Sequence, residues 1–585
     1  MFLTARFTKY SVFQDRLAIT IWGNYLMRFN RILTTLFISS TIFLYGCSNS
    51  ETDSQMDTAD SSGPVASNIG LVQNPNPTVP MAAVLTLTTD EPSMLSLGFN
   101  DGTRNWTVTP STDYLTAHEV PVVGMRAGIT HSITAILTDE AGNTTEIVAG
   151  DFDVPELPEF YPRPHVVVSQ PDRMEPGVNV FNVNGRWPEK WADTLPAVIV
   201  DNQGETIWYY EPDGHLLHDI KRISNGNFLY EIWPGTGGMV EIDLLGNIVN
   251  RWHFTGTARD PAPGSIAVES DSIHHDMIEI PNGNFLVMSS EVRAYDNWHT
   301  STRDPNAPRQ DGAQLVGDVI IEITREGEVV NEWKLLDLID PYRITHGSLR
   351  EDYYAAHYSH RYDGIVYDYT HGNAIIYDES DNSFIMSMPY QNAVLKVSMT
   401  NGELVWILGT HEGWSEEYQD KLLTPVGDVE WSYKHHAISH SGRGTLLLFD
   451  NGVDRTMPYE DSMPLVDSYS KGVEYAVNEE TMEVSQPWEY GIEQEHFYNR
   501  YLGDIDWQPT TGNILINSGA RETAPGTNTN VPPGQAQRWA SWFEVTSDEA
   551  REKVWELQFR DEGLGWSVYR VDRLPNIYPN NEPTL

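Results

Sequence analysis

Polar residues recur at one position of a repeated sequence pattern, and their types suit group transfer or metal binding. Counting ten residues back from the first large apolar residue after a hairpin leads from Phe228 to His218, from Phe285 to His275, from Leu446 to His436 and from Ile514 to Asp504. In a unit with a longer hairpin, His371, Gly372 and Asn373 fall close to the same place. Imidazoles that converge can transfer a group covalently, exchange protons near neutral pH or bind a metal.

The same histidines have a purely structural interpretation, because an imidazole at a strand end can serve only to bond the backbone. That interpretation is favoured for His218, whose unit has no other supporting feature. A shared register rarely arises by chance, so His275, His371 and His436 are predicted to meet in one site. Alternation along a strand turns His274 and His435 to the opposite face, which predicts structural roles for both.

A repeat of short strands must position these residues. Each unit combines tight hairpins with a strand that ends in tryptophan, and glycine supplies the positive φ that such hairpins require. The hairpins read SNGNFL (224–229), PNGNFL (281–286), GRGTLL (442–447) and TGNILI (511–516). The terminal tryptophans are Trp208, Trp252, Trp333, Trp406, Trp488 and Trp555.

Sheets this small cannot bury their faces singly, but stacked around an axis they can. Residues 157–585 are therefore predicted to form a six-bladed β-propeller, whose first strands line a central channel. Two β-sandwiches in series are the alternative, which the regular units disfavour. Unequal spacing predicts long loops, gathered on one face over the site, at 255–271, 293–316, 336–367 and 410–430.

The region before the propeller is predicted to contain a small β-sandwich at 76–156, so the fold class is all-β. Leu85 and Leu87 alternate with threonines, which places both leucines on one face of a strand. Residues 48–75 are rich in Ser, Asp and Thr and bury too little apolar surface to order themselves. They are predicted to be a flexible linker.

Residues 1–47 are predicted to be an N-terminal extension and a signal peptide. Met27 opens a basic and then apolar run, short for a membrane span, that ends at Cys47. Its end resembles a bacterial lipobox, which implies that Cys47 is lipidated; an ordinary signal peptide with an incidental cysteine is the alternative. The start is either Met1 or Met27. By the same resemblance, Ser48 after the cysteine implies the outer rather than the inner membrane, and therefore the periplasmic side of a bacterial envelope.

Charge and cysteine content exclude several function classes. The chain has 37 Lys and Arg residues against 83 Asp and Glu residues, a formal net charge of −46. Nucleic-acid binding is therefore disfavoured, and membrane contact is expected only through the lipid anchor. A single cysteine excludes an intrachain disulfide and any paired-cysteine metal or redox site. No oligomeric state is predicted.

Several segments, in order, resemble the bacterial arylsulfate sulfotransferases. They are HHDMIEIPNGNFLV (274–287), YDYTHGNAIIYDESDNSFIMSMPYQNAVLKV (367–397), GELVWILG (402–409), EWSYKHHAISHSGRGTLLLFDNG (430–452) and WSVYRVDRLPNIYP (566–579). The resemblance implies an N-terminal sandwich and a six-bladed propeller. It also implies transfer of a sulfuryl group from a phenolic sulfate donor to a phenol acceptor, without a nucleotide donor or other cofactor, through a sulfohistidine.

By position in these motifs, the resemblance makes His436 the nucleophile and His275, His371 and Asn373 the other central residues. Sulfuryl oxygens need hydrogen-bond donors as charge spreads over them, and the departing phenolate needs a proton or a positive neighbour. His275, His371 and Asn373 suit these roles. Phenolate is a tolerable leaving group, so no metal is required.

One departure from the family pattern concerns sulfate binding. Pro389 stands where the resemblance implies an arginine that holds the sulfuryl oxygens. Losing one such charge-assisted contact weakens binding by about 1.5–3 kcal/mol. Arg521 and Arg361 are the predicted substitutes. Because of this departure a second hypothesis stays open, a propeller that binds a small ligand or metal in its histidine-lined channel without sulfuryl transfer.

Overall fold

The computed structural model describes residues 60–583 except 160, 162, 186–195, 213–215, 234–236, 258–259, 352–353, 355–357, 359–360, 362–363, 561–564 and 580. The predicted signal peptide with Cys47, and the linker up to residue 59, lie outside the described residues. Within the described ranges, no helix is both long and apolar enough to cross a membrane. Short 3-10 helices accompany the strands: η2 (Leu335–Asp337), η3 (Pro389–Gln391), η4 (Glu416–Tyr418), η5 (Leu465–Asp467) and η6 (Pro533–Gln535).

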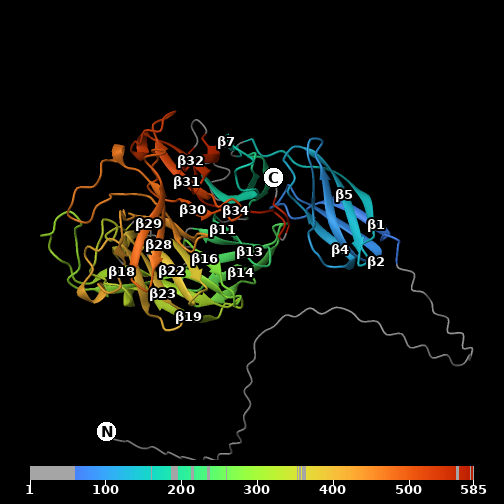
Figure 1. Ribbon diagram of the computed structural model, residues 1–585. Coiled ribbons are helices and arrows are strands. Elements are labelled where there is room, and N and C mark those ends of the chain that lie inside the picture. Colours follow the sequence, from blue (N-terminus) through green and yellow to red (C-terminus); the bar gives the residue numbers. More distant parts are fainter. Residues whose placement is uncertain are drawn as a thin grey trace, which may run out of the picture. The chain divides into compact units, whose positions relative to one another are not determined.

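The N-terminal β-domain is organised around one long strand. Its strands are β1 (Ala66–Gln73), β2 (Ala83–Asn100), β3 (Asn105–Val108), β4 (Leu115–Val122), β5 (Thr130–Asp139) and β6 (Thr144–Asp153). The first half of β2 pairs with β1 and β4, and most of the second half pairs with β3 and β5, so β2 serves both layers of the domain (Figure 1). Leu85 and Leu87 are buried, as the alternation predicts.

The linker prediction is wrong at its C-terminal end. Ala66–Gln73, predicted to be flexible, is β1 and pairs with β2. No side chain of this strand is fully buried. Ladder hydrogen bonds to β2 therefore order a segment whose composition alone suggests disorder.

Six antiparallel sheets follow in the described part of the chain, each built on four strands. Sheet 1 contains β34 (Trp566–Leu574), β8 (Val178–Gly185), β9 (Ala197–Asp201) and β10 (Thr206–Tyr210). Sheet 2 contains β11 (Leu216–Arg222), β12 (Phe228–Trp233), β13 (Gly238–Ile242) and β14 (Ile248–Phe254), with β15 (Ile266–Val268) added in parallel. Sheet 3 contains β16 (Met277–Glu279), β17 (Phe285–Tyr295), β18 (Ala313–Ile323) and β19 (Val329–Lys334), with β20 (Val366–Asp368) beside β18.

The second half of the chain forms the other three sheets. Sheet 4 contains β21 (Ala374–Asp378), β22 (Ser383–Met388), β23 (Ala393–Ser398) and β24 (Leu404–Gly409). Sheet 5 contains β26 (His436–His440), β27 (Leu446–Asp450), β28 (Lys471–Asn478) and β29 (Glu483–Tyr490), with β25 (Thr424–Pro425) outside. Sheet 6 contains β30 (Asp504–Trp507), β31 (Ile514–Thr523), β32 (Gln537–Val545) and β33 (Lys553–Phe559), with β7 (His165–Ser169) outside.

Two pairings link the ends of the propeller region. The C-terminal β34 pairs with β8 in sheet 1, and the N-terminal β7 pairs with β33 in sheet 6. The first strand in the order of each sheet, here called its inner strand, is β34, β11, β16, β21, β26 or β30. Contacts between β16 and β21, β21 and β26, β26 and β30, β30 and β34, and β34 and β11 bring inner strands of successive sheets together.

Three of the terminal tryptophans connect one sheet to the next by a hydrogen bond. The indole Nε1–H groups of Trp208, Trp252 and Trp555 donate to the carbonyl oxygens of Leu244, Arg325 and Asn202, at 3.0, 2.9 and 2.9 Å. Each acceptor lies in the outer turn of the following sheet, and Asn202 belongs to sheet 1, so sheet 6 is fastened back to the first. This circular order excludes two sandwiches in series.

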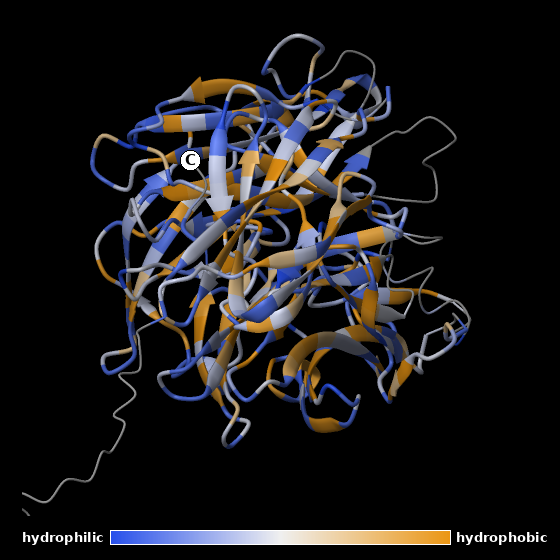
Figure 2. Cartoon of the chain, turned by 90° about the vertical axis from the view of Figure 1, so that its right-hand side faces the viewer, coloured by the Kyte–Doolittle hydropathy of each residue, from blue (hydrophilic) through white to orange (hydrophobic). Residues whose placement is uncertain are grey.

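The apolar core lies between neighbouring sheets. One buried cluster joins sheets 2 and 3, another joins sheets 4 and 5, and a third joins sheets 5 and 6. Figure 2 shows apolar residues concentrated along strands and hydrophilic residues along many connections. The all-β prediction, with a small β-domain ahead of propeller-type sheets, is confirmed. The predicted loop 293–316 is partly wrong, because β17 and β18 continue as a ladder to the pair Tyr295–Ala313.

Candidate active site

The inner strands of sheets 2 to 5 share an uncommon backbone conformation near their starts. Asp219, His275, His371 and Ala437 have φ values of 41°, 61°, 52° and 57°. This region costs an L-residue roughly 1–2 kcal/mol. The ladders of β11 and β26 also shift register at these points. Such kinks re-aim side chains and cluster at functional sites, and each coincides with or adjoins a position that the shared register selects.

His436 is held in one tautomer by a neighbouring sheet. Its Nδ1 lies 2.7 Å from the carbonyl oxygen of Gly503, which can only accept a hydrogen bond, so Nδ1 carries the proton. Burial, and next the charge of Arg570, hold the pKa of His436 well below its usual value. The ring is therefore neutral at pH 7, with a lone pair on Nε2. An unprotonated imidazole nitrogen of this kind is a nucleophile.

His275 is oriented by the histidine that precedes it. The Nδ1 atoms of His274 and His275 lie 2.9 Å apart, and His274 Nε2 lies 3.0 Å from the Ser289 carbonyl and 3.3 Å from an Asp318 carboxylate oxygen. Burial opposes the charged form of His274, but Asp318 outweighs it and raises the pKa of His274. When His274 is protonated, it donates from Nδ1 to the Nδ1 of His275, and the proton of His275 is then on Nε2.

The prediction that alternation separates His274 from His275 is therefore wrong. The left-handed backbone at His275 interrupts the alternation, so adjacent rings meet with centroids 5.1 Å apart. Burial, and then the charge of His371, lower the pKa of His275 well below its usual value. The surroundings thus favour the neutral form of His275 and the charged form of His274.

His371 lies between an acid and an aromatic ring. Its Nδ1 is 2.5 Å from Asp368 Oδ2, and its ring stacks on Tyr390 with centroids 4.3 Å apart. The ring of His275 is 4.9 Å away. The carboxylate accepts from Nδ1–H, which orients the ring and leaves Nε2 as the ring nitrogen that a substrate can meet.

Asn373 is fixed by its neighbours on both sides of its amide. Its Nδ2 donates to the His435 carbonyl at 3.1 Å, and its Oδ1 accepts from the Ser387 hydroxyl at 2.5 Å. An amide nitrogen carries two hydrogens, so this bond occupies one of them. The prediction of a structural role for His435 agrees with its burial and its carbonyl contact.

Three of these residues border a cavity of about 420 Å³. Its lining residues are Arg350, His371, Asn373, Pro389, Tyr390, Lys434, His436, Asn451, Val453, Arg500 and Tyr501. His371, Asn373 and His436 are thus brought together around one cavity, whereas His275, whose ring centroid is 4.9 Å from that of His371, is not among the lining residues. Pro389 lines the cavity at the start of η3, so the position expected to carry an arginine does face this space.

The two arginines predicted to replace that charge lie elsewhere, which corrects the prediction. Arg521 is buried, with Nη1 2.8 Å from Glu495 and Nε 2.8 Å from the Ser518 hydroxyl. Arg361 pairs with Asp271 at 2.8 Å and donates to the Gly256 carbonyl. Neither lines the cavity. Spacing along the chain could not place either side chain, because each contacts a carboxylate that is distant in the sequence, Glu495 for Arg521 and Asp271 for Arg361.

Arg570 is a central residue that the register argument missed. On β34, its Nη1 lies 3.1 Å from Asp276 and 3.3 Å from Asp219, and its Nη2 donates to the Asn373 carbonyl. Burial disfavours its charge, but Asp276 and the other acids outweigh this and raise the pKa of Arg570. The signal was present in the tail segment WSVYRVDRL, but no hairpin follows β34, so the ten-residue count never reached it.

His218 has the structural surroundings predicted for it. Its Nδ1 lies 3.0 Å from Glu231 Oε2, and its ring packs on Tyr569 at 3.8 Å. Burial, the largest influence, lowers the pKa of His218 to about 3. Tyr569 also contacts His436 edge-on, with centroids 5.1 Å apart, and so separates the two histidines.

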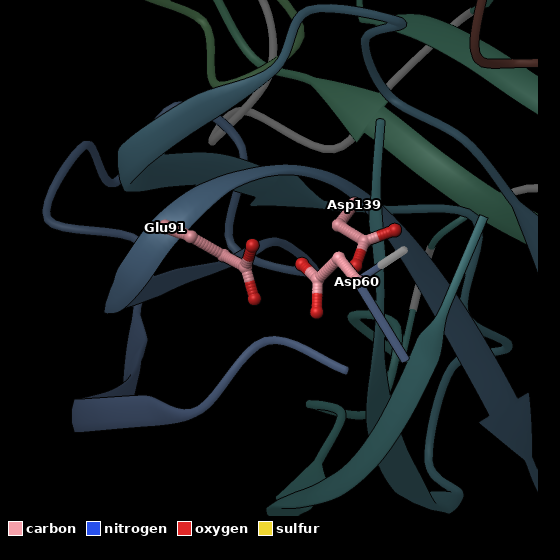
Figure 3. A group of neighbouring side chains, drawn as sticks. All are labelled: Asp60, Glu91 and Asp139. Atoms are coloured by element: carbon pink, nitrogen blue, oxygen red, sulfur yellow. The ribbon is translucent and has the colours of Figure 1, made fainter. Parts of the chain in front are cut away.

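Two groups of three carboxylates among the described residues have oxygens within 4.8 Å of one another. The first group contains Asp504, at the sheet 6 register position, with Asp506 and Asp572. Burial raises the pKa of Asp504 to about 6. Burial and the charge of Asp504 together raise the pKa of Asp572 to about 7. The other group, Asp60, Glu91 and Asp139, lies in the N-terminal domain (Figure 3). The central histidines belong to neither group.

Comparison with known proteins gives two family matches. Residues 165–570 match the family described as Arylsulfotransferase (ASST), and residues 71–150 match the Arylsulfotransferase Ig-like domain. The arylsulfate sulfotransferase AssT of Escherichia coli O6:H1 (strain CFT073) is 26% identical over 358 residues, 53% of this chain and 55% of the relative. AssT of Lelliottia amnigena is 25% identical over 370 residues, 55% of this chain and 57% of the relative. The chain thus aligns with just over half the length of these relatives.

Similarity to solved structures is more distant. A hypothetical selenium-binding protein from Sulfolobus tokodaii has a TM-score of 0.31 at 9% identity, covering 84% of this chain and 95% of that one. A putative 6-phosphogluconolactonase from Bacteroides fragilis has a TM-score of 0.30 at 10% identity, covering 82% and 98%. Scores this low carry no argument about fold or function.

Proposed function

The chain belongs to the arylsulfotransferase family, and from this premise we propose that it transfers a sulfuryl group from a phenolic sulfate ester to a phenol through sulfated His436. The observation that carries the proposal is the state of His436. Its Nδ1–H is bound to Gly503, its pKa is lowered by burial, and it lines the central cavity. A neutral ring with its proton on Nδ1 presents Nε2 to an incoming sulfur.

In the first half-reaction, the Nε2 lone pair of His436 attacks the sulfur of the donor. An N–S bond forms, the S–O bond to the aryl ring breaks, and the phenolate leaves with the bonding electrons. Protonated His371, whose Nδ1 lies 2.5 Å from Asp368, gives its Nε2 proton to that oxygen. The aryl part of the donor departs as a neutral phenol, the sulfuryl group stays on His436, and His371 is left neutral.

In the second half-reaction, an acceptor phenol occupies the place of the first. It returns its proton to His371, and its oxygen attacks the same sulfur. The N–S bond breaks with its electrons returning to Nε2, which regenerates neutral His436. Two successive displacements at one site give ping-pong kinetics.

His275 and Asn373 complete the proposed site as hydrogen-bond donors. A charged His274 leaves His275 with a proton on Nε2, beside His371. Asn373 keeps one amide hydrogen beyond its bond to His435. Donors aimed at oxygens that gain charge in the transition state stabilise it more than the ground state. No cofactor enters these steps.

Turnover of a chromogenic aryl sulfate with phenol as acceptor tests the proposal. We expect phenol release that is lost in His436→Ala and kept in His440→Ala, an exposed histidine on the same strand. Mass spectrometry after exposure to the donor alone should find one sulfuryl group on the peptide containing His436. Absence of turnover and of this adduct would contradict the proposal.

A ligand- or metal-binding channel remains the competing hypothesis. The central histidines do not form a group of three ligand atoms within 4.8 Å among the described residues, which disfavours a metal. Metal analysis of the purified protein separates the two: stoichiometric metal without turnover would support this alternative.

We also propose that lipid on Cys47 holds the protein at the periplasmic side of the outer membrane, because the residues that precede Cys47 resemble a lipobox. Fatty-acid labelling of the expressed chain tests this. Labelling should disappear in Cys47→Ser, and an unlabelled wild-type chain would contradict the anchor.

A further inference from the structure

The lining of the cavity has a charge opposite to that of the chain. Acidic residues outnumber basic ones by 83 to 37 in the sequence, yet the described lining contains Arg350, Lys434 and Arg500 and no carboxylate. A cavity with this sign attracts anions into an otherwise repulsive surface. A sulfate monoester is such an anion.

Lys434 is the buried cation among the three. It is 8% exposed, whereas Arg350 and Arg500 are exposed, and Arg500 has Nη1 3.6 Å from Glu522. The two arginines therefore lie at the rim. Lys434 precedes His436 by two residues, and both line the cavity.

The surroundings of Lys434 hold its ammonium group in place. Nζ lies 4.1 Å from the centroid of the Tyr390 ring, which in turn stacks on His371. The backbone of Lys434 is in the left-handed region, with φ 52°, and its N–H donates to Asn392 Oδ1 at 3.0 Å. A Cβ at residue 347 would overlap Nζ, so Gly347 makes room for it. These contacts preorganise one positive charge beside His371 and His436.

From this arrangement we propose that Lys434 binds the sulfate group of the donor, in place of an arginine at position 389. Pro389 also lines the cavity but offers neither charge nor a donor. The ammonium contacts the sulfuryl oxygens while His436 faces the sulfur. The identity of the anion as a sulfate ester rests on the proposed function. The preference of the cavity for an anion over a neutral ligand does not.

A pair of probes that differ in charge tests this role. We propose to titrate the full chain, in a His436→Ala background, with 4-nitrophenyl sulfate and with neutral 4-nitrophenyl methanesulfonate. Lys434→Met should weaken sulfate binding about 10- to 100-fold and leave binding of the neutral probe within about twofold. Lys434→Arg should keep most of the affinity, and Lys421→Met, outside the cavity, should match the background.

Each outcome decides the role of Lys434. Unchanged sulfate affinity in Lys434→Met, or equal losses for both probes, would overturn the proposal, since a packing role affects both probes alike. Lys434→Gln, with a polar neutral end, serves as the second variant should Lys434→Met fail to fold. If the wild-type chain has no turnover but the loss is charge-selective, the proposed function fails while the anion role of Lys434 stands.

Discussion

His436 donates its Nδ1–H to the carbonyl oxygen of Gly503 at 2.7 Å, from sheet 5 to the residue that precedes β30 of sheet 6. The tautomer of the proposed nucleophile is therefore set by a different sheet. Gly503 has φ 120°, and a Cβ there would lie 2.5 Å from the ring of Phe449. Only glycine supplies this carbonyl position without displacing a buried ring.

Gly503→Ala should therefore affect both stability and chemistry. We expect the free energy of unfolding to fall by about 1–3 kcal/mol, and sulfation of His436 to slow. Urea unfolding and the burst of phenol release measure the two effects. Gly444→Ala is the matched control, because Gly444 has φ 74° but nothing within 4 Å of its Cβ position. If Gly503→Ala gave the same burst of phenol release as the wild-type protein, sulfation of His436 would not depend on the position of this carbonyl.

Arg570→Met should destabilise the protein and shift the pH dependence of sulfation. It leaves Asp219 and Asp276 without this buried partner, which typically costs about 3–5 kcal/mol. The charge of Arg570 also lowers the pKa of His436, so its removal raises that pKa. The sulfation rate should then begin to fall at a higher pH on acidification. Arg560→Met, away from the hub, should leave the pH profile unchanged.

Asp572→Asn should stabilise the protein at alkaline pH more than at acid pH. The folded-state pKa of Asp572 is raised to about 7, above its unfolded value, so the folded state binds more protons in between and loses stability as pH rises. Removing the charge should raise Tm more at about pH 8 than at about pH 5. The exposed Asp461→Asn serves as control. Equal shifts at both pH values would argue against a shared, strained cluster.

Pro389→Arg should strengthen binding of the sulfate ester. Residue 389 lines the cavity, so a guanidinium there can reach the anion. We expect KM for a chromogenic aryl sulfate to fall severalfold, and more in a Lys434→Met background. An unchanged or higher KM would count against the alignment that places the family arginine at this position.

Local sequence pattern sufficed for the repeat and for most of its register. Trp208 and Trp252 lie on outer strands, and His275 and His436 stand at equivalent inner positions, because hairpin and strand lengths are encoded within each unit. The placement of His371 and Asn373 beside the cavity followed from the same register together with the family resemblance.

Other features of the site depend on segments that are distant in the chain. Arg570 reaches the hub because β34, at the C-terminus, completes sheet 1 with β8, roughly 390 residues earlier. Left-handed backbone at the non-glycine residues His275 and Lys434 shapes two contacts of the site. It brings His274 against His275, and it places Lys434 beside Gly347 and Tyr390. No propensity signals such conformations, because the packing around them supplies the free energy that holds them.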